Sequence, residues 1–319
     1  MVRNTRGRLW LMRFNLAELS GALGDLGTFI PLVVSLIAVC GMDAGSVLVF
    51  AGLFNVLSGI VFNQPVPVQP MKAIAAVAIA EGLSPGEIAA AGFGTGIVIL
   101  CLSVLGLVRA AERWVPRPVV RGIQLGVGLK LAVTGLGMVT AVEWLGLDSR
   151  AVALAGGVLI LATAGRRFPS ALIIFLAGLG VLYVEAPEVF SATSVGWSGP
   201  SIVWPTSSEW SSGFTRGTLP QVPLTLLNSV IALSLLSRDL FPDRPLSVGR
   251  VATSVGVMNA IACLLGGMPA CHGSGGLAGQ YRFGARTGGS VLMLGIAKII
   301  LGLAFGSAAL VVLSAFPGS

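Results

Sequence analysis

A run of three prolines followed by a lysine, NQPVPVQPMK at residues 63–72, interrupts a strongly apolar part of the sequence. Proline has no backbone donor and favours extended backbone in the residue before it, so the segment leading to Pro70 is predicted to be extended. Pro70 itself is predicted to begin a helix, since proline suits the first helical turn. The start of a helix presents free N–H groups and about half a positive charge, and Lys72 adds a cation there. Together these features predict half of an anion-binding site.

A glycine-rich run, HGSGG at residues 272–276, offers the same chemistry near the other end of the sequence. Its backbone N–H groups meet little side-chain obstruction, and it is predicted to open a short helix over 273–282. Two such helix starts facing one cavity with Lys72 would supply a charge of roughly +2, which suits a tetrahedral dianion. A tight helix crossing is the alternative interpretation of the glycines. His272, the only histidine, is predicted either to cap this segment or to contact a substrate.

Two carboxylates, Glu18 and Asp25, lie nearly two helical turns apart in an apolar segment and therefore on one face of a helix. Carboxylates on a membrane helix usually face a pathway or a partner, because leaving them in lipid is costly. They would repel an anion unless they were paired or protonated. We therefore expect either ion pairs with Lys72 or Lys130, or proton-coupled anion transport. For Glu18, exposure to water near the cytoplasmic end is a further alternative, and Lys298 is expected to extend to the membrane interface.

Neutral hydrogen-bonding side chains gather in the apolar segment 217–237. An oxyanion accepts hydrogen bonds, so amide and hydroxyl donors are the groups that such a site needs. Asn228 and Ser229 are predicted to contact the substrate, and the alternative is that hydroxyl groups bond to the backbone of their own helix. The polar residues of the segment are Gln221, Thr225, Asn228 and Ser229.

The composition excludes a water-soluble domain. Hydrophobic residues make up 55% of the 319 residues and charged residues 10%, with a mean hydropathy of +0.91, whereas soluble domains are about a quarter charged. Glycine is abundant at 44 residues, which suits close packing of membrane helices. The four cysteines stand singly in apolar stretches and are interpreted as small buried hydrophobic residues. No cofactor, metal site or catalytic site is predicted.

Apolar segments long enough to cross a bilayer, which takes about 20 helical residues, predict about eleven spans. With a cytoplasmic N-terminus, most arginines fall in inside segments, while Arg150 and Arg216 fall outside. This bias follows the positive-inside rule, so the net charge of +7 reflects membrane topology and predicts no nucleic-acid partner. The predicted spans are 15–38, 45–62, 68–80, 84–108, 118–140, 151–165, 168–184, 219–237, 248–267, 273–282 and 288–315.

The segments 51–67 and 255–271 are similar, and each leads into one of the two interrupted stretches. An odd number of predicted spans separates them, so the second copy is predicted to be inverted, as in transporters whose binding site lies at the membrane midplane. The second copy matches only the first four spans before the sequence ends at Ser319, so a truncated second repeat without spans twelve to fourteen is expected. The alignment pairs Gly52 with Gly256, Asn55 with Asn259 and Pro65 with Pro269.

Four stretches resemble the molybdate transporter family, a branch of the sulfate permease-like superfamily: ELSGALGDLGTFIP, PVPVQPMKAIAAVAI, LPQVPLTLLNSVIA and GGMPACHGSGGLAGQYRFGARTGG. The resemblance extends over residues 15–315. It implies an all-α polytopic membrane protein built as a 7+7-type inverted repeat, with two half-helices at the midplane. The substrate would lie between the half-helices. Their starts match Gln69, Met71 and Lys72 in the first, and His272, Gly273, Ser274, Gly275 and Gly276 in the second.

The same resemblance implies a core domain that moves like an elevator against a gate domain, in a homodimer. The expected core comprises 15–115 and 218–319, and the expected gate comprises 116–184. A cytoplasmic N-terminus at 1–14 and an external loop at 185–217 complete the organisation. Because of the truncation, the gate is expected to be half built.

The expected function is secondary active transport of molybdate across the plasma membrane, within the lipid bilayer and with a proton as co-substrate. Glu18 and Asp25 would carry proton coupling or gating. Sulfate and tungstate are further candidate substrates, because they share shape and charge with molybdate. The alternatives are a sulfate permease, a channel, and a nucleobase transporter, which would not need Lys72. An intramembrane enzyme using His272 and Ser274 is another alternative, although no motif supplies an orienting acid.

Overall fold

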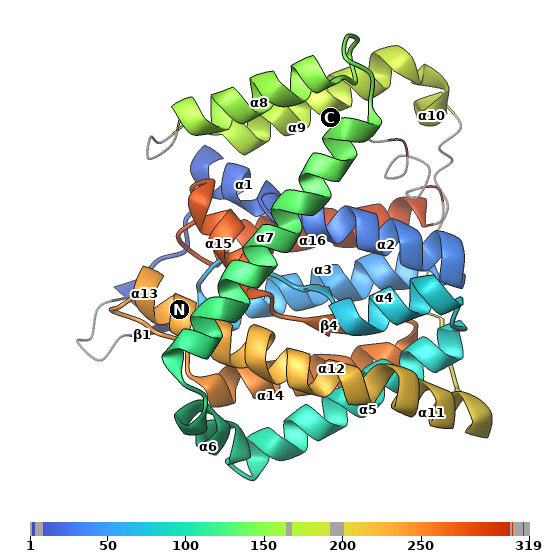
Figure 1. Cartoon of the computed structure of the whole chain (residues 1–319), viewed down its shortest axis with the longest axis vertical. Coiled ribbons are helices and arrows are strands. Elements are labelled where there is room, and N and C mark those ends of the chain that lie inside the picture. Colours follow the sequence, from blue (N-terminus) through green and yellow to red (C-terminus); the bar gives the residue numbers. More distant parts are fainter. Residues whose placement is uncertain are drawn as a thin grey trace.

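The computed structural model describes residues 2–3, 9–163, 168–191, 201–306, 308 and 315 (Figure 1). Helices make up almost all of the described secondary structure. Residues 164–165 of the predicted sixth span and residues 307 and 309–314 of the predicted eleventh span lie outside the described residues. So do residues 192–200 of the predicted external loop and parts of the predicted N-terminal segment.

The elements follow one another closely through the first part of the chain. They are β1 (Val2–Arg3), β2 (Leu9–Trp10), α1 (Leu16–Leu23), α2 (Leu26–Cys40), α3 (Ala44–Phe62), β3 (Gln69–Pro70), α4 (Lys72–Glu81), α5 (Pro85–Val104) and α6 (Leu107–Trp114). A middle group follows, with α7 (Arg117–Ala141), α8 (Arg150–Ala162), α9 (Ser170–Glu185) and α10 (Pro187–Ser191). Strands β1 and β2 form a short antiparallel pair.

The last part of the chain contains several irregular helices. Its elements are α11 (Ser207–Gly213), η1 (Phe214–Thr218), α12 (Leu219–Leu224), η2 (Thr225–Ala232), α13 (Leu233–Leu240), α14 (Val248–Ala262), η3 (Cys263–Leu265), β4 (Ala270–Cys271), α15 (Ser274–Arg282) and α16 (Gly289–Phe305). Of these, η1 and η2 are π-helical and η3 is a 3₁₀ turn. The segment from Ser207 to Leu240 is one continuous helical stretch.

Two helix starts differ from their predicted positions. Helix α4 begins at Lys72 and not at Pro70, because Pro70 is held in β3 and the Met71 N–H donates to Pro269 O at 2.8 Å. The helical stretch predicted from 219 begins already at Ser207. Its start is a capping box, in which the Thr206 and Glu209 side chains each accept a hydrogen bond from the other residue's backbone N–H. The polar composition around this capping box concealed the helix.

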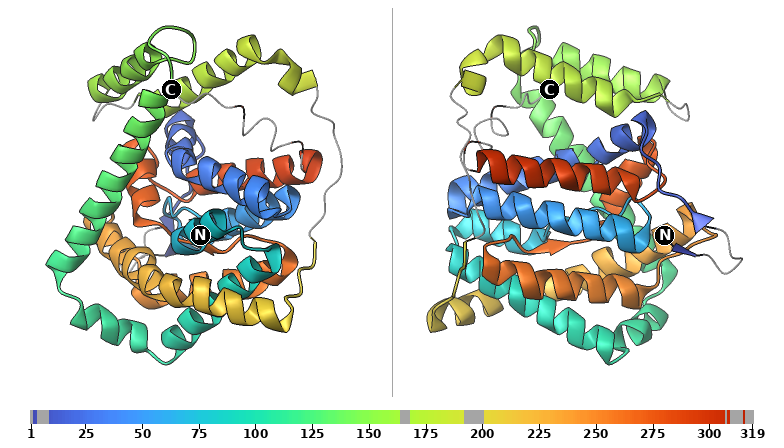
Figure 2. Two further views of the ribbon diagram at one scale, coloured as in Figure 1. Left: turned by 45° about the vertical axis from the view of Figure 1, so that its right-hand side comes forward. Right: turned by 180° about the vertical axis from the view of Figure 1, so that it is seen from behind.

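Four long helices lie in the order α16, α3, α14 and α5 (Figure 2). Helix α3 packs along α16, and α14 packs along α5. Glycines make both crossings close: a Cβ atom on Gly52 would lie 2.5 Å from Gly295 O, and one on Gly256 would lie 3.0 Å from Gly96 O. Small residues allow this close approach between membrane helices.

The two interrupted stretches meet between these layers. Strands β3 and β4 pair antiparallel, with Gln69 opposite Cys271 and Pro70 opposite Ala270. Helices α4 and α15 therefore start from one small two-stranded sheet, although their sequences lie far apart (Figure 1). This pairing positions the candidate site.

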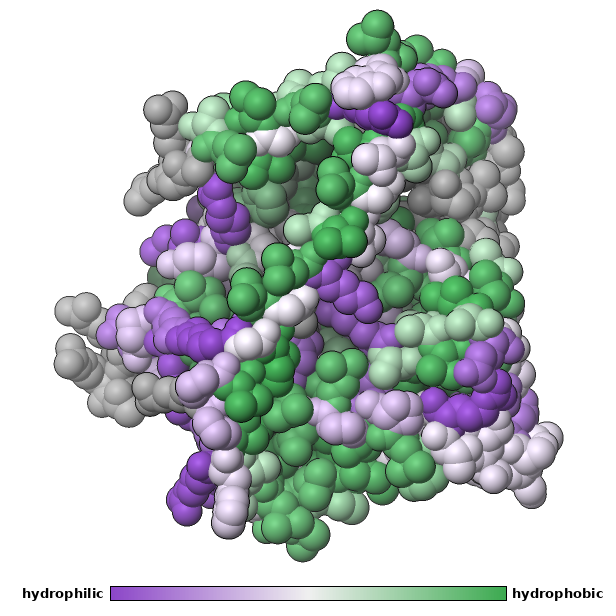
Figure 3. Space-filling view, in the orientation of Figure 1, coloured by the Kyte–Doolittle hydropathy of each residue, from purple (hydrophilic) through white to green (hydrophobic). Residues whose placement is uncertain are grey.

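Helices α7 to α10 form an arm around the other helices (Figures 1 and 2). The arm contacts the rest of the chain mainly through α7 against η2 and α15, and through α9 against α1. Figure 3 shows hydrophobic residues over much of the face that α7 crosses. Among the exposed side chains of α7 are Leu125, Leu129, Val133 and Leu136. Helices α7 and α8 fall within the predicted gate range 116–184, α9 ends one residue beyond it, and α10 lies in the range predicted for the external loop. The division into core and gate stays a prediction.

Five described helices are long and apolar enough to cross a membrane, or six if α1 and α2, which meet at a bend of 45°, are one span. Helices α8, α9 and α16 are shorter apolar helices. The predicted number of about eleven spans stays a prediction. The five long helices are Ala44–Phe62, Pro85–Val104, Pro118–Ala141, Ser207–Leu240 and Val248–Leu265.

Candidate functional site

Four chain segments converge on the small sheet: the bend between α1 and α2, the β3–α4 junction, η2 and the β4–α15 junction. Gln69 of β3 is the central side chain of this group. Its Nε2 donates to Asp25 Oδ1, and its Oε1 accepts from Lys72 Nζ at 3.4 Å. Gln69 and Asp25 are almost fully buried, and Lys72 is half-buried. Lys72 and Asp25 are thus brought together, with an amide between them.

The ion pairs predicted for the carboxylates are not formed among the described residues. No carboxylate oxygen of Glu18 or Asp25 lies within 4.0 Å of a lysine nitrogen there. Gln69 occupies the position between Asp25 and Lys72 instead. Lys130 is exposed on α7. The expectation of a direct pair was therefore wrong, because an amide can donate to one charged group and accept from the other.

The start of α15 lies directly against this group. A Cβ atom on Gly276 would lie 2.5 Å from Asp25 Oδ1 and 2.7 Å from Gln69 Nε2, and one on Gly273 would press on Gln69 Oε1. Gly273 is the N-cap residue of α15 and has no side chain to cap it. The N–H groups of the first turn, which begins at Ser274, therefore have no partner within their own helix. Gly275 is half-buried, whereas its neighbours are buried.

Helix α4 starts differently, because a distant glutamine caps it. Gln221 Oε1 accepts from Ala73 N at 2.9 Å and from Ile74 N at 3.3 Å, while its Nε2 donates to Thr225 Oγ1 at 2.8 Å. Gln221 was named among the neutral hydrogen-bonding groups of its segment, and in the structure its amide satisfies the start of α4. The anion-attracting groups are therefore Lys72 on one side and the uncapped start of α15 on the other.

The polar residues of η2 reach the same place. Ser274 Oγ donates to Asn228 Oδ1 at 2.9 Å, and Ser229 lies near Cys271 of β4. Thr225, Asn228 and Ser229 are all buried. The π-helical backbone was not predicted, and such turns are frequent at functional sites. Pro220 and Pro223, just before η2, are the local signals that this helix is irregular.

His272 is held by the protein on both sides of its ring. Its Nδ1 lies 2.9 Å from Pro67 O, and its Nε2 lies 3.0 Å from Ser254 Oγ. Phe62 packs edge-on against the ring, with centroids 5.6 Å apart. Of the two predicted alternatives, this geometry supports a structural role and not substrate contact, since neither ring nitrogen is left for a substrate. The ring ties the Pro67 carbonyl to Ser254 of α14 and caps no helix. Ser274 has no histidine partner here, because its hydroxyl bonds to Asn228.

Lys298 of α16 was expected to extend to the membrane interface, and this expectation was wrong. Its side chain is 3% exposed, its Nζ donates to Asn55 Oδ1 at 2.9 Å, and the ammonium lies 3.4 Å from the centroid of the Phe29 ring. Lys298 and Lys72 both attract the Asp25 carboxylate electrostatically. The sequence signal for a buried partner was the place of Lys298 inside an apolar segment, where a charged side chain needs one.

Glu18 anchors α1 to the turn between α15 and α16. Its Oε1 accepts from Arg286 N at 3.1 Å, from Thr287 N at 3.0 Å and from Thr287 Oγ1 at 3.0 Å. The residue is 1% exposed, so the expectation of a wet carboxylate was wrong. This arrangement gives Glu18 a structural task, while the coupling or gating role predicted for it stays a prediction.

Replacing Glu18 with glutamine is expected to lower the free energy of unfolding by about 1–3 kcal/mol, because hydrogen bonds to a charged acceptor are stronger than those to an amide. Oxyanion affinity should change less than twofold. Thermal unfolding in detergent and an oxyanion titration measure the two effects. Asp239→Asn, which removes an exposed ion pair with Arg121, is the matched control and should have little effect. A loss of affinity at unchanged stability would instead assign Glu18 to the binding reaction.

Comparisons with known proteins agree with this architecture. Residues 17–131 and 213–319 match the family described as molybdate transporter of MFS superfamily. Molybdate transporter 2 of Arabidopsis thaliana is 44% identical over 98% of this chain and 77% of its own length. Molybdate transporter 1 of the same plant is 40% identical over 96% of this chain and 76% of its own length. The resemblance found in the sequence is thereby confirmed.

Solved structures show the same fold at low sequence identity. The transmembrane domain of the cyanobacterium bicarbonate transporter BicA superposes with a TM-score of 0.58 at 14% identity, covering 94% of this chain and 87% of that chain. The murine Solute Carrier 26 family member A9 anion transporter, in its inward-facing state, also gives 0.58, at 12% identity, covering 96% of this chain and 60% of that chain. The chain is therefore a helical membrane protein of the molybdate transporter family, which is a family of transporters and not of enzymes.

Proposed function

We propose that this chain carries molybdate across the plasma membrane as a secondary transporter and binds it between the starts of α4 and α15. The observation that carries the proposal is the β3–β4 pairing, which brings Lys72 and the uncapped start of α15 to one place. The names of the Arabidopsis relatives support molybdate as the substrate. Sulfate and tungstate are the competing substrates, because each is also a tetrahedral dianion.

The groups around this position suit such a dianion. Lys72 provides a full positive charge, and the α15 start provides about half a charge together with the N–H groups of Ser274, Gly275 and Gly276. Gln69 and Asn228 bring further amide groups close to the helix start. A substrate oxygen would compete for Lys72 with the Gln69 amide, whose bond of 3.4 Å is long for a hydrogen bond. Met71, also predicted at the site, is buried beside Lys72.

Asp25 is the group proposed to couple transport to protons. Its Oδ1 accepts from Gln69, and its Oδ2 is buried and has no hydrogen-bond partner among the described residues. A carboxylate beside an anion site repels the substrate, whereas a protonated carboxyl group can donate to it. Proton binding at Asp25 and oxyanion binding would therefore favour each other. This coupling supports symport of a proton with the anion.

The proposed transport movement is that of an elevator, within a homodimer whose N-termini are cytoplasmic. Two features support it: the α3–α16 and α14–α5 packing fits an inverted repeat around the antiparallel β3–β4 pair, and the α7–α10 arm has few contacts with the remaining helices. The moving core would comprise 15–115 and 218–319, and the gate would lie within 116–184. The external loop would lie within 185–217.

The test is ligand-dependent thermal stabilisation of the purified chain, followed by uptake into proteoliposomes. Molybdate at 100 times its dissociation constant should stabilise the folded state by about 2.7 kcal/mol, and phosphate and uracil should have no effect. Saturable molybdate uptake that increases with an inward proton gradient supports symport, and unsaturable flux would indicate a channel. Stabilisation by sulfate alone would indicate a sulfate permease, and stabilisation by uracil alone a nucleobase transporter.

A further inference from the structure

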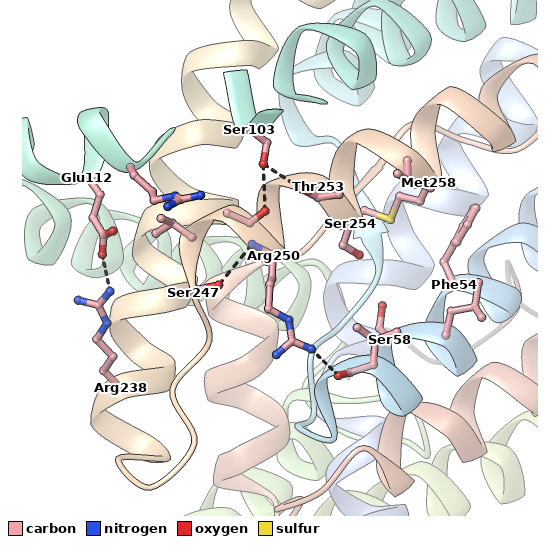
Figure 4. Close-up of a pocket in the computed structure, with 16 residues that line it drawn as sticks. Phe54, Ser58, Ser103, Glu112, Arg238, Ser247, Arg250, Thr253, Ser254 and Met258 are labelled. Carbon is pink, nitrogen blue, oxygen red and sulfur yellow. Dashed lines mark hydrogen bonds and ion pairs between the residues drawn. The ribbon is translucent and has the colours of Figure 1, made fainter. Parts of the chain in front are cut away.

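A pocket of about 750 Å³ lies between α3, α14 and the α5–α6 junction (Figure 4). It shares no lining residue with the candidate site, although Ser254 of its wall bonds to His272. One wall is apolar and includes Phe54, Leu57, Val61, Val257 and Met258. Leu57, Val61 and Val257 are 43%, 47% and 40% exposed. They lie on helices long enough to span a membrane, so in a bilayer this exposed apolar wall would meet the hydrocarbon region.

The opposite part of the pocket is basic. Arg109, Arg238 and Arg250 line it, but Arg238 is paired with Glu112 at 2.5 Å (Figure 4). Arg250 donates to Val61 O at 3.1 Å through Nη2, which leaves its other guanidinium donors available. The Arg109 backbone N–H donates to Gly106 O at 3.1 Å, but its guanidinium group has no hydrogen bond or ion pair within the described part of the chain. Two arginines are therefore available for an anion.

The start of α14 strengthens this positive region. Ser247 caps the helix, and Ser247, Val248 and Gly249 all line the pocket. A helix start contributes about half a positive charge and favours phosphate groups. Thr253 lies one turn further along and bonds to Ser103 at 2.9 Å, which adds a hydroxyl pair to the pocket wall.

Helix α6 indicates how deep in the membrane the basic end of the pocket lies. It has exposed Leu107 and Trp114 as well as exposed Arg109 and Arg113. A short helix with apolar, aromatic and basic residues is typical of the membrane–water interface. The arginines of the pocket thus lie at headgroup level, while Leu57 and Val257 lie along the lipid side.

We propose that this pocket binds an anionic phospholipid. The phosphate would lie on Arg109 and Arg250 at the start of α14, and an acyl chain would lie along Leu57, Val61 and Val257. A free inorganic anion would use the arginines but would leave the apolar wall uncovered, so the lipid fits the whole pocket. The basic end is on the predicted cytoplasmic side, where anionic lipids attract basic residues. This lipid site is separate from the proposed molybdate site.

The test is native mass spectrometry of the purified full chain with phosphatidylglycerol, phosphatidylcholine of the same acyl chains, and inorganic phosphate. Phosphatidylglycerol should bind at least tenfold more tightly than phosphatidylcholine. The double variant Arg109→Gln/Arg250→Gln should lose this preference, whereas Arg113→Gln, which removes an arginine of the same helix outside the pocket, should keep it. Ser254 is left unchanged in all variants, because it also bonds to His272.

A second variant separates the lipid from a free anion. Val257→Trp fills the apolar groove without changing charge, so it should weaken phosphatidylglycerol binding at least tenfold and leave any phosphate binding unchanged. Unfolding temperatures without lipid verify that each variant is folded. The proposal would be overturned if both lipids bound equally, or if Arg113→Gln lost the preference as much as the double variant. It would also be overturned if inorganic phosphate bound tightly and Val257→Trp altered neither phosphate binding nor lipid binding.

Discussion

Replacing Lys72 with alanine is expected to weaken molybdate binding about 10- to 150-fold. Hydrogen bonds to charged groups contribute about 1.5–3 kcal/mol each, and this range corresponds to that loss. Lys72 is half-buried, and its ammonium donates a long hydrogen bond of 3.4 Å to the Gln69 amide oxygen. The ammonium is therefore available to a substrate. Removing it would also leave Asp25 with one attracting cation fewer, which adds to the repulsion of an anion.

The measurement is a molybdate titration of the purified variant, with uptake into proteoliposomes as the second readout. Lys130→Ala is the matched control, because Lys130 is also a lysine in a predicted span but is exposed on α7. It should bind molybdate as the wild type does. If Lys72→Ala bound molybdate with wild-type affinity, Lys72 would not belong to the proposed site. An equal loss of molybdate affinity in both variants would indicate a general effect of net charge.

Replacing Gly276 with alanine is expected to abolish molybdate binding. The new Cβ atom would lie 2.5 Å from Asp25 Oδ1 and 2.7 Å from both Gln69 Nε2 and Pro67 Cγ. Asp25 and Gln69 are buried and bonded to each other, and Pro67 is buried in the extended segment, so none of them can move away without breaking the group. Such overpacking costs about 1–3 kcal/mol of stability.

Thermal unfolding and molybdate titration together test this expectation. Gly27→Ala in α2 is the matched control, because an added Cβ atom there meets nothing within 4 Å. It should leave binding unchanged and stabilise the helix by up to about 1 kcal/mol. A Gly276→Ala protein that is less stable but binds molybdate normally would show that the close contact serves packing alone.

Local chemistry was sufficient to predict the two interrupted stretches. The prolines before Lys72 and the glycines after His272 restrict the backbone directly, so an extended segment and two short helices followed from these residues without tertiary information. Hydropathy likewise predicted the long helices. These features depend on neighbouring residues, which a single sequence contains in full.

The partners of the site side chains were not predictable in the same way. Gln221 caps a helix 148 residues before it in sequence, and Lys298 bonds to Asn55 across 243 residues. Nothing local distinguishes a glutamine that caps a distant helix from one that contacts a substrate. The bridging position of Gln69 between Asp25 and Lys72 is a further case, because it depends on how the α1–α2 bend meets the β3–α4 junction.

The separation between Asn55 and Lys298 has a consequence for biogenesis. The ribosome adds about 5–20 residues per second, so roughly 12 to 50 s pass between the two residues, which are 243 positions apart. During this time α3 is complete but α16, its main packing partner, has not been made. The early helices must therefore wait in the translocon or the bilayer before Lys298 can donate to Asn55. A chain released before Lys298 is made would expose the Asn55 side chain to membrane quality control.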